Sequence, residues 1–405
     1  MRPALALLAA ATLAALALPP TDAGAQSTDG GYRASLVRWR AAERGFDDWE
    51  LAGTSRNAQG ALVLDPATAQ AGTDTPGAFH SRNFYNGAGY SVGEATGPLT
   101  PASFGFTRAV ASWNARTPAG TWIEVDARLQ VSGHFSRFYN LGVWAEDGST
   151  IERHSVDDQR DDDAKVAVDT LILGDAVPPA DGIQLRVRLF SARPAEASPT
   201  VTLAAVTTST TPERPASPST GDPTRWGKVL EVPTCSQRAY PDGGEVWCSP
   251  TSTSMVVGYW AKDGGPCEAR VRAAVAGVYD WVFDGHGNWP FNTAYAAVAA
   301  GLEGYVTRLA SLAEAEAWIA AGVPVVMSYS WTEGQLPNAP VSSSEGHLGV
   351  LVGFDASGNP VMNDPAGATD GEVRRSYPRA DFEALWLGHS GGTAYVIHPP
   401  GHPTP

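Results

Sequence analysis

The sequence predicts a two-domain protein in which an all-β sandwich of the jelly-roll or lectin-like kind precedes an α+β domain. Residues 32–206 contain short segments that alternate apolar and polar residues, and residues 207–224 are rich in Pro, Ser and Thr. Residues 225–400 carry helical stretches followed by strand-like runs. Alternation with period two is typical of strands, and a Pro/Ser/Thr-rich stretch cannot bury an apolar face. A chain of 405 residues is also longer than one core usually serves.

The first domain shows strand-like segments throughout residues 32–206. The alternation is clear in five segments, which are residues 122–131, 138–144, 164–173, 183–190 and 200–206. Gly, Asp and Pro residues separate these segments, and helical periodicity is almost absent. Short strands joined by such turns are typical of antiparallel sandwiches. The Pro/Ser/Thr-rich residues 207–224 are then expected to form a solvated, semi-extended linker.

The periodicity changes after the linker. Helices are predicted at residues 250–260, 267–278, 293–300, 312–321 and 379–385. Strands are predicted at residues 324–331, 347–354, 360–363 and 393–398. Helices that come first and strands that cluster late favour an α+β domain with helices packed on an antiparallel sheet.

The N-terminus has the pattern of a secretory signal peptide. Met1-Arg2-Pro3 is followed by an Ala/Leu run to Leu18 and by the small residues Ala23-Gly24-Ala25. The apolar run is too short to span a bilayer comfortably, and it suits a cleaved signal. The sequence therefore predicts removal of residues 1–25 and a secreted protein, extracellular or in the cell envelope. No later stretch reaches the roughly 18 apolar residues that a membrane span needs.

The charge balance argues against one class of partner. The chain carries 28 Lys and Arg against 43 Asp and Glu, which gives a formal net charge of -15. Binding to nucleic acid needs a basic surface, so nucleic acid is not an expected partner. The histidines show no zinc spacing, and His286 suits a loop. The acidic run at residues 157–163 lacks the glycine and terminal glutamate of an EF-hand loop, so a solvated turn is expected there rather than a calcium site.

The three cysteines leave an odd count for an exported chain. One of them is then a free thiol or an intermolecular partner. We expect Cys235 to pair with Cys267, because this choice leaves Cys248 unbridged in the one context that suits a helix start. The other two pairings would place Cys248 in a bridge. An ordinary buried thiol is the alternative to a reactive Cys248.

Cys248 stands in a setting that favours a nucleophile. Ser249 and Pro250 suit the N-cap and first turn of a helix, and apolar positions follow them. The thiol is therefore expected at a helix N-terminus. There, the unpaired N–H groups and the positive end of the helix dipole favour the thiolate, which is the attacking species.

Three further residues supply the other groups that cysteine catalysis needs. His347 opens a predicted strand, and Asp364 ends the next one, so a hairpin would bring a carboxylate beside the imidazole. Asn363 is expected to point to the opposite face because side chains alternate along a strand. Gln237 precedes Cys248 by eleven positions, and its neutral amide suits an oxyanion hole together with the Cys248 N–H.

These motifs resemble those of the papain-like cysteine peptidases related to the bacteriocin-processing, double-glycine peptidases, in their stand-alone secreted branch. The resemblance rests on Gln237, on Trp-Cys-Ser-Pro around Cys248, on Gly-His-Leu-Gly-Val around His347 and on Asn-Asp-Pro around Asp364. It covers residues 226–400. It implies a papain-like fold, hydrolysis of peptide bonds without a cofactor or metal, and a catalytic set formed by Cys248, His347, Asp364 and Gln237.

The sequence therefore predicts a secreted cysteine peptidase with a peptide or protein substrate. One alternative keeps the cysteine and changes the bond, as in a cell-wall amidase or a transglutaminase-like acyl transferase. Another is a catalytically inactive protein that binds a cell surface or a carbohydrate through the sandwich. Its aromatic residues would suit a sugar-stacking face or a core: Phe84, Tyr85, Tyr90, Trp113, Phe135, Phe138 and Tyr139.

Overall fold

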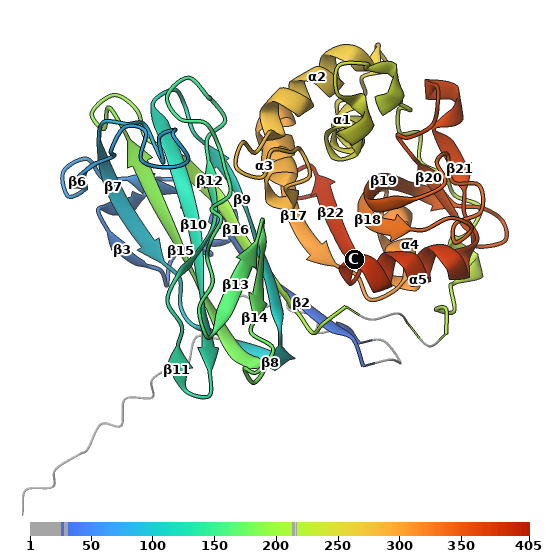
Figure 1. The fold of residues 1–405 in the computed structure, drawn as a ribbon, viewed down its shortest axis with the longest axis horizontal. Coiled ribbons are helices and arrows are strands. Elements are labelled where there is room, and N and C mark those ends of the chain that lie inside the picture. Colours follow the sequence, from blue (N-terminus) through green and yellow to red (C-terminus); the bar gives the residue numbers. More distant parts are fainter. Residues whose placement is uncertain (1–25, 28–30, 213–214, 216) are drawn as a thin grey trace, which may run out of the picture.

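The computed structural model describes residues 26–27, 31–212, 215 and 217–405. The predicted signal peptide, residues 1–25, lies outside the described residues. Figure 1 shows two parts side by side, a sandwich of β-strands and a mixed part in which helices surround a sheet. The prediction of an all-β domain followed by an α+β domain is confirmed.

The N-terminal domain contains two antiparallel sheets. The first consists of β1 (Gln26–Ser27), β2 (Arg33–Arg40), β4 (Thr54–Arg56), β5 (Leu62–Leu64), β9 (Arg108–Arg116), β13 (Ala164–Ala167), β14 (Thr170–Leu173) and β16 (Thr200–Ser209). The second consists of β3 (Glu50–Ala52), β6 (Gln70–Thr73), β7 (Gly89–Thr96), β8 (Thr100–Phe106), β10 (Thr121–Val131), β11 (His134–Phe135), β12 (Tyr139–Trp144) and β15 (Ala180–Ser191). Alternate residues of both sheets meet in one apolar core that includes Trp39, Trp113 and Leu189.

Two predicted segments of this domain differ in the structure. Residues 164–173 form a hairpin of β13 and β14 rather than one strand, because the chain turns at Val168 and Asp169. Strand β16 runs to Ser209, so the first three residues of the range assigned to the linker belong to the sheet. Thr207 and Ser209 are buried there by the second domain, a contact that local composition does not reveal.

The C-terminal domain is built on an antiparallel sheet in the order β17-β22-β18-β19-β20-β21. Its strands are β17 (Glu303–Arg308), β18 (Val325–Trp331), β19 (Ser344–Phe354), β20 (Pro360–Asn363), β21 (Arg374–Ser376) and β22 (Thr393–His398). The helices are α1 (Cys248–Ala261), α2 (Cys267–Val278), α3 (Trp289–Ala300), α4 (Leu312–Ala320) and α5 (Arg379–Ser390). Short 3-10 turns of this part of the chain are η2 (Pro223–Arg225), η3 (Gln237–Ala239), η4 (Gly244–Val246) and η5 (Asp370–Glu372), whereas η1 (Ala41–Glu43) belongs to the sandwich. Strands β17 and β21 lie outside the predicted strand ranges.

Capping explains where helix α3 begins and ends. The side chain of Asn288 accepts a hydrogen bond from Phe291 N at the N-cap, and Pro290 occupies the first turn, where its missing N–H costs nothing. Gly301 ends the helix with a left-handed φ of 64°. Helix α3 therefore begins one turn earlier than the predicted helix at 293–300, because Asn288 and Pro290 favour a start at Trp289.

The two domains join along strand β17, whose outer edge would otherwise present unpaired backbone groups. The Asn114 side chain of β9 donates to Gly304 O at 2.7 Å and accepts from Gly304 N at 3.2 Å. Ser112 Oγ accepts from Val306 N at 3.1 Å, and Thr207 Oγ1 donates to Val306 O at 2.8 Å. Side chains of the sandwich therefore complete the hydrogen bonding of an edge strand in the other domain.

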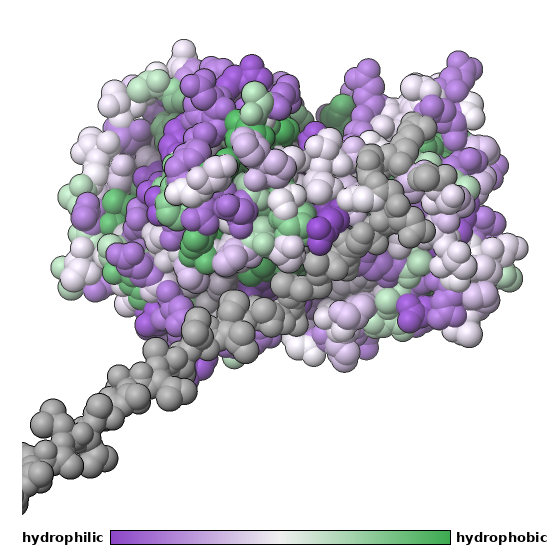
Figure 2. Space-filling view, turned by 90° about the horizontal axis from the view of Figure 1, so that it is seen from below, coloured by the Kyte–Doolittle hydropathy of each residue, from purple (hydrophilic) through white to green (hydrophobic). Residues whose placement is uncertain are grey.

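Apolar packing continues this interface along helix α3. Phe291 and Ala294 belong to the core of the sandwich, and the Phe291 ring lies 5.4 Å from that of Trp144. A half-buried ion pair between Arg40 and Glu303 joins the domains at 2.6 Å. Viewed from below, hydrophilic residues dominate both parts of the surface, with smaller hydrophobic patches between them (Figure 2).

None of the helices within the described residues combines the length and apolar character that a membrane crossing would need.

Candidate active site

Cys248 is the first residue of helix α1. The helix therefore starts earlier than the sequence predicts, with Trp247 rather than Ser249 as the N-cap. Ser249 lies in the first turn, and its hydroxyl is 2.9 Å from Tyr395 Oη on β22, so it does not cap the helix. The half-buried Cys248 thiol thus lies at the helix N-terminus, where first-turn N–H groups have no partner within the helix.

The hairpin of β19 and β20 places His347 beside Asp364. His347 lies on β19, the turn of the hairpin is closed by the hydrogen bond from Asp355 N to Asn359 O, and Asp364 follows β20. His347 Nε2 is 2.7 Å from Asp364 Oδ1, and both side chains are buried. Because Nε2 faces the carboxylate, Nδ1 is the ring nitrogen left for the thiol.

Two tyrosines that the sequence analysis did not assign to the site hold Asp364. Tyr377 Oη donates to Asp364 Oδ2 at 2.6 Å, and Tyr329 Oη donates to the same oxygen at 2.9 Å. Ala366 N donates to Oδ1 at 2.9 Å. The carboxylate is therefore fixed by four donors in all, which satisfies a charge that burial would otherwise penalise.

The pKa values reflect this arrangement. Burial alone would raise the pKa of Asp364, but the charge and hydrogen bond of His347 lower it to about 2. Burial alone would lower the pKa of His347, but the charge and hydrogen bond of Asp364, with Cys248, raise it to about 10. Burial raises the pKa of the Cys248 thiol, whereas His347 and the N–H groups of Leu348 and Ser249 bring it below its ordinary value. These directions favour a thiolate–imidazolium pair.

Gln237 lies in the turn η3, and its side chain is buried. Its Nε2 donates to Gly244 O at 2.7 Å, which fixes the orientation of the amide. The second amide hydrogen has no acceptor within the part of the chain that the structure describes. Gly244 must be glycine, because a Cβ there would lie 2.0 Å from Gln237 O. The turns η3, which contains Gln237, and η4, which precedes the start of α1, therefore pack closely against each other.

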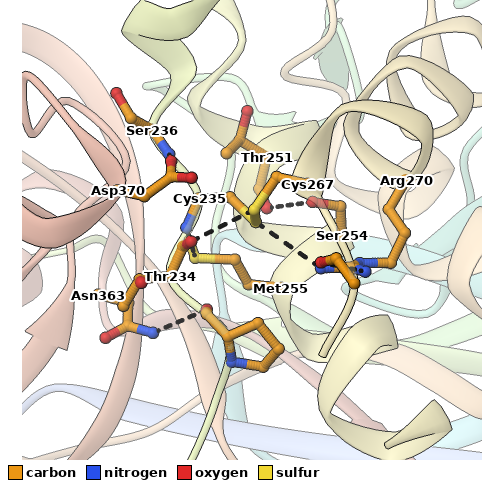
Figure 3. Close-up of a disulfide and its surroundings, with 12 residues drawn as sticks. Thr234, Cys235, Ser236, Thr251, Ser254, Met255, Cys267, Arg270, Asn363 and Asp370 are labelled. Carbon is orange, nitrogen blue, oxygen red and sulfur yellow. Dashed lines mark hydrogen bonds between the residues drawn. A yellow bond between two sulfur atoms is a disulfide. The ribbon is translucent and has the colours of Figure 1, made fainter. Parts of the chain in front are cut away.

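The disulfide between Cys235 and Cys267 is present, as predicted, and Cys248 is free. Figure 3 shows the bridge joining the segment before Gln237 to the start of α2. Ser236 adds two contacts on the other side of this segment: its N donates to Asp370 Oδ1 at 2.7 Å, and its Oγ donates to Gly367 O at 2.5 Å.

Asn363 faces away from His347, as strand alternation predicts. Its Nδ2 donates to Val232 O at 3.2 Å and to Pro233 O at 3.1 Å, and its Oδ1 accepts from Arg374 Nε. Asn363 therefore secures the segment that leads to Gln237, while its neighbour Asp364 contacts the histidine.

A cavity of about 410 Å³ lies beside these residues. Gln237 and His347 line it, together with Tyr240, Val341 and Ala366. The cavity supplies room for a ligand next to the imidazole and the glutamine. Chemically, the arrangement offers a nucleophile, a proton donor and acceptor, and amide donors for a developing oxyanion.

The aromatic residues and the acidic run of the first domain have structural contacts. Trp113 and Tyr139 are fully buried in the sandwich core, whereas Phe135 is exposed, so the seven aromatic residues do not form one face. Asp161 of the acidic run accepts hydrogen bonds from Arg137 and Tyr139. Among the described residues, His, Cys, Asp and Glu side chains form no cluster able to hold a metal ion.

Comparison with known proteins defines the class of the chain. Residues 35–209 match the peptidase C39 N-terminal domain, and residues 229–393 match the peptidase C39-like family. The two matches fall on the sandwich and on the α+β domain that carries the cysteine. The chain therefore belongs to the C39 papain-like cysteine peptidases.

Solved structures give more distant likenesses. A candidate C39-like peptidase from Bacillus anthracis is 19% identical over 42% of this chain and 96% of its own, with a TM-score of 0.30. A promiscuous carbohydrate-binding module of the β-sandwich superfamily is 8% identical over 45% of this chain and 73% of its own, with a TM-score of 0.20. No curated protein is similar to the chain at a significant level.

Proposed function

We propose that the protein is a secreted cysteine peptidase that hydrolyses peptide bonds with Cys248 as nucleophile, His347 as acid and base, and Asp364 as the group that orients His347. The observation that carries the proposal is the buried contact of His347 with Asp364, next to a free cysteine at a helix N-terminus. Membership of the C39 peptidases supports the same chemistry.

The reaction begins with the thiolate of Cys248 and the imidazolium of His347. The sulfur attacks the peptide carbonyl carbon, and the carbonyl electrons move to its oxygen. When the tetrahedral intermediate collapses, the C–N bond breaks and the imidazolium gives its proton to the leaving amine. Water then attacks the thioester, His347 takes a proton from it, and the carboxylic acid product leaves as the thiolate is restored.

The developing oxyanion meets two donors in this proposal. One is the second amide hydrogen of Gln237, which the bond to Gly244 leaves available. The other is the N–H of Cys248, which has no partner within helix α1. Loss of one such donor typically lowers kcat by about 10²- to 10³-fold.

Export is part of the proposal. The pattern of residues 1–25 is that of a cleaved signal, and the disulfide of Cys235 and Cys267 is a bond that persists in oxidising compartments. The N-terminal sequence of the protein recovered from its producing cells tests this part. We expect it to begin at Gln26 outside the cytoplasm, and an uncleaved cytoplasmic chain would contradict export.

Peptide cleavage by the purified protein tests the enzymatic part. A mixture of proteome-derived peptides is incubated with the wild-type protein and with the variant Cys248→Ala, and new termini are identified by mass spectrometry. We expect cleavage by the wild type alone, while both proteins show the same thermal unfolding. Equal cleavage by the variant would refute the mechanism, and release of side-chain amines without new peptide termini would favour the amidase or transferase alternative.

A further inference from the structure

A cavity of about 280 Å³ lies where the two domains meet. Its walls come from both domains: Arg108, Val168 and Asp169 from the sandwich, and Trp289, Arg308 and His389 from the α+β domain. We refer to these six residues as the arginine cavity.

Within the described part of the chain, two guanidinium groups of this cavity form no ion pair. Arg308 is buried with 3% of its surface exposed, and it donates one hydrogen bond to Ser209 Oγ. The Nε atoms of Arg308 and Arg108 are both buried and unbonded. Among the described residues, no carboxylate lies within ion-pair distance of either group. In a protein with a formal net charge of -15, these two cations thus lie together without an ion pair to any described residue.

The two arginines are close enough to affect each other. Burial, followed by the positive charge of Arg308, lowers the pKa of Arg108. A buried charge without a counter-charge is costly, and such a group in a cavity is a candidate for contact with a ligand of opposite charge. A fork of guanidinium donors is well matched to a carboxylate.

The other polar groups of the cavity do not neutralise this charge. Asp169 Oδ2 accepts a hydrogen bond from Trp289 N at 2.7 Å, and its Oδ1 accepts one from Thr170 Oγ1 at 3.0 Å. Burial raises the pKa of Asp169 to about 6, although the charge of Arg308 acts in the opposite direction. At neutral pH Asp169 therefore contributes one negative charge against two positive ones. Burial lowers the pKa of His389, which keeps its ring neutral.

One residue of the cavity wall, His389, lies near strand β19, which carries His347. His389 Nε2 lies 3.9 Å from the position that a Cβ on Gly346 would take, and Gly346 directly precedes His347. On the sandwich side, Val168 at the tip of the β13–β14 hairpin has a φ of 58°, a left-handed conformation that is strained for a β-branched residue. Strain of this kind concentrates at ligand-binding positions.

We propose that the arginine cavity binds a carboxylate group of the peptide substrate, so that the enzyme favours substrates carrying a negative charge at one fixed position from the scissile bond. The inference rests on the proposed peptidase function and deepens it by naming a substrate class. It also gives the N-terminal domain a part in substrate selection, because Arg108 and the hairpin tip belong to the sandwich. The carboxylate comes from an acidic side chain or from the C-terminus of the peptide.

Matched peptide pairs test the proposal. Peptides cleaved by the wild type are resynthesised with Glu changed to Gln at each position, and as free acids or amides at the C-terminus. We expect one change to lower kcat/KM by about 10- to 100-fold in the wild type, since charge-assisted hydrogen bonds contribute that much. The first series identifies a side-chain carboxylate, and the second identifies a terminal one.

Three variants assign the effect to the cavity. Arg108→Gln removes a guanidinium that forms no ion pair among the described residues. We expect the ratio of kcat/KM for the charged peptide to that for the neutral peptide to fall to about one in this variant. Arg108→Lys should retain part of the preference. Arg116→Gln makes the same charge change at an exposed arginine of the same strand and should keep the wild-type preference. A wild type without preference in either series, or an Arg108→Gln variant that keeps it, would overturn the inference while leaving the peptidase function standing.

If the wild type cleaves no peptide, the proposed peptidase function is refuted. A binding measurement then tests separately whether the arginine cavity binds a carboxylate. Thermal unfolding of the wild type and Arg108→Gln is then compared in N-acetylglutamate and in N-acetylglutamine. A rise in Tm with the anion alone, absent from the variant, supports the cavity as a carboxylate site. No difference between the two compounds, or between the two proteins, rejects it.

Discussion

His347 Nε2 lies 2.7 Å from Asp364 Oδ1 in a buried pair that joins strand β19 to the residue directly after the adjacent strand β20. The pKa of Asp364 is about 2, so its contribution to stability is present above the unfolded-state value of about 4 and is lost as the pH falls toward 2. The pKa of His347 is about 10, so its contribution is complete below the unfolded-state value of about 6.5 and is lost as the pH rises through 10. The pair therefore stabilises the fold most between about pH 4 and pH 6.5.

Replacing Asp364 with Asn should lower kcat by about 10²- to 10⁴-fold, because the imidazolium loses its counter-charge and its preferred tautomer. Steady-state kinetics on a cleaved peptide provide the measurement. Asp381→Asn, at an exposed carboxylate in the first turn of α5, is the matched control and should leave kcat unchanged. If both variants behave alike, Asp364 does not orient the histidine.

Removing the hydroxyl of Tyr377 should raise the pKa of Asp364, because the carboxylate loses a 2.6 Å hydrogen bond. Tyr377→Phe is then expected to move the acid limb of thermal stability toward higher pH by about one unit, with a smaller loss of kcat than Asp364→Asn. Tyr259→Phe, which loses a hydroxyl bonded to Gly322 O far from the site, is the control. An unshifted acid limb would show that Tyr377 does not support the carboxylate.

Asn114→Ala should destabilise the protein by about 1–3 kcal/mol for each backbone group of Gly304 that is left unpaired. The reason is that Asn114 bonds both the N–H and the C=O of an edge strand in the other domain. Chemical unfolding measures the change, with Gln70→Ala on the exposed strand β6 as the control. A variant as stable as the control would mean that the domain contact does not stabilise β17.

Removing the disulfide with the double variant Cys235→Ala and Cys267→Ala should lower the free energy of unfolding by about 3–4 kcal/mol, given the loop of 32 residues that it closes. Ser236 and Asn363 still hold the segment before Gln237, so peptidase activity should fall far less than in Cys248→Ala. Unfolding curves and kcat/KM are measured on the same samples. Complete loss of activity in a folded variant would show that the bridge alone positions Gln237.

Much of the C-terminal domain could be predicted from sequence, since its elements are bounded by local signals. Helix α2 and strands β20 and β22 occupy the predicted ranges, and the Cys235–Cys267 bridge follows from the odd cysteine count and the context of Cys248. Strand β17 was missed because its burial depends on the other domain. It begins with Glu303 and ends with Arg308, two charged residues that do not indicate a buried strand. Their charged groups are accommodated by contacts with the sandwich, since Glu303 pairs with Arg40 and Arg308 donates to Ser209.

The supporting residues of the site were harder to predict for the same reason. Tyr377 and Tyr329 are distant from Asp364 in the sequence, and nothing in their local pattern separates them from core tyrosines. The hydroxyl of Ser249 suits an N-cap by residue type, but Tyr395 on β22 engages it, and the helix starts at Cys248. In each case the role of the side chain depends on a tertiary contact that the neighbouring sequence does not reveal.

The reactivity of Cys248 toward iodoacetamide as a function of pH tests the central claim most directly, with the labelled residue identified by mass spectrometry. A thiolate held by His347 should react rapidly well below pH 9, because the pKa of Cys248 lies under its ordinary value. His347→Gln should move the inflection of the rate upward. A wild-type inflection at the value of a free thiol, unchanged in His347→Gln, would contradict the proposed catalytic pair.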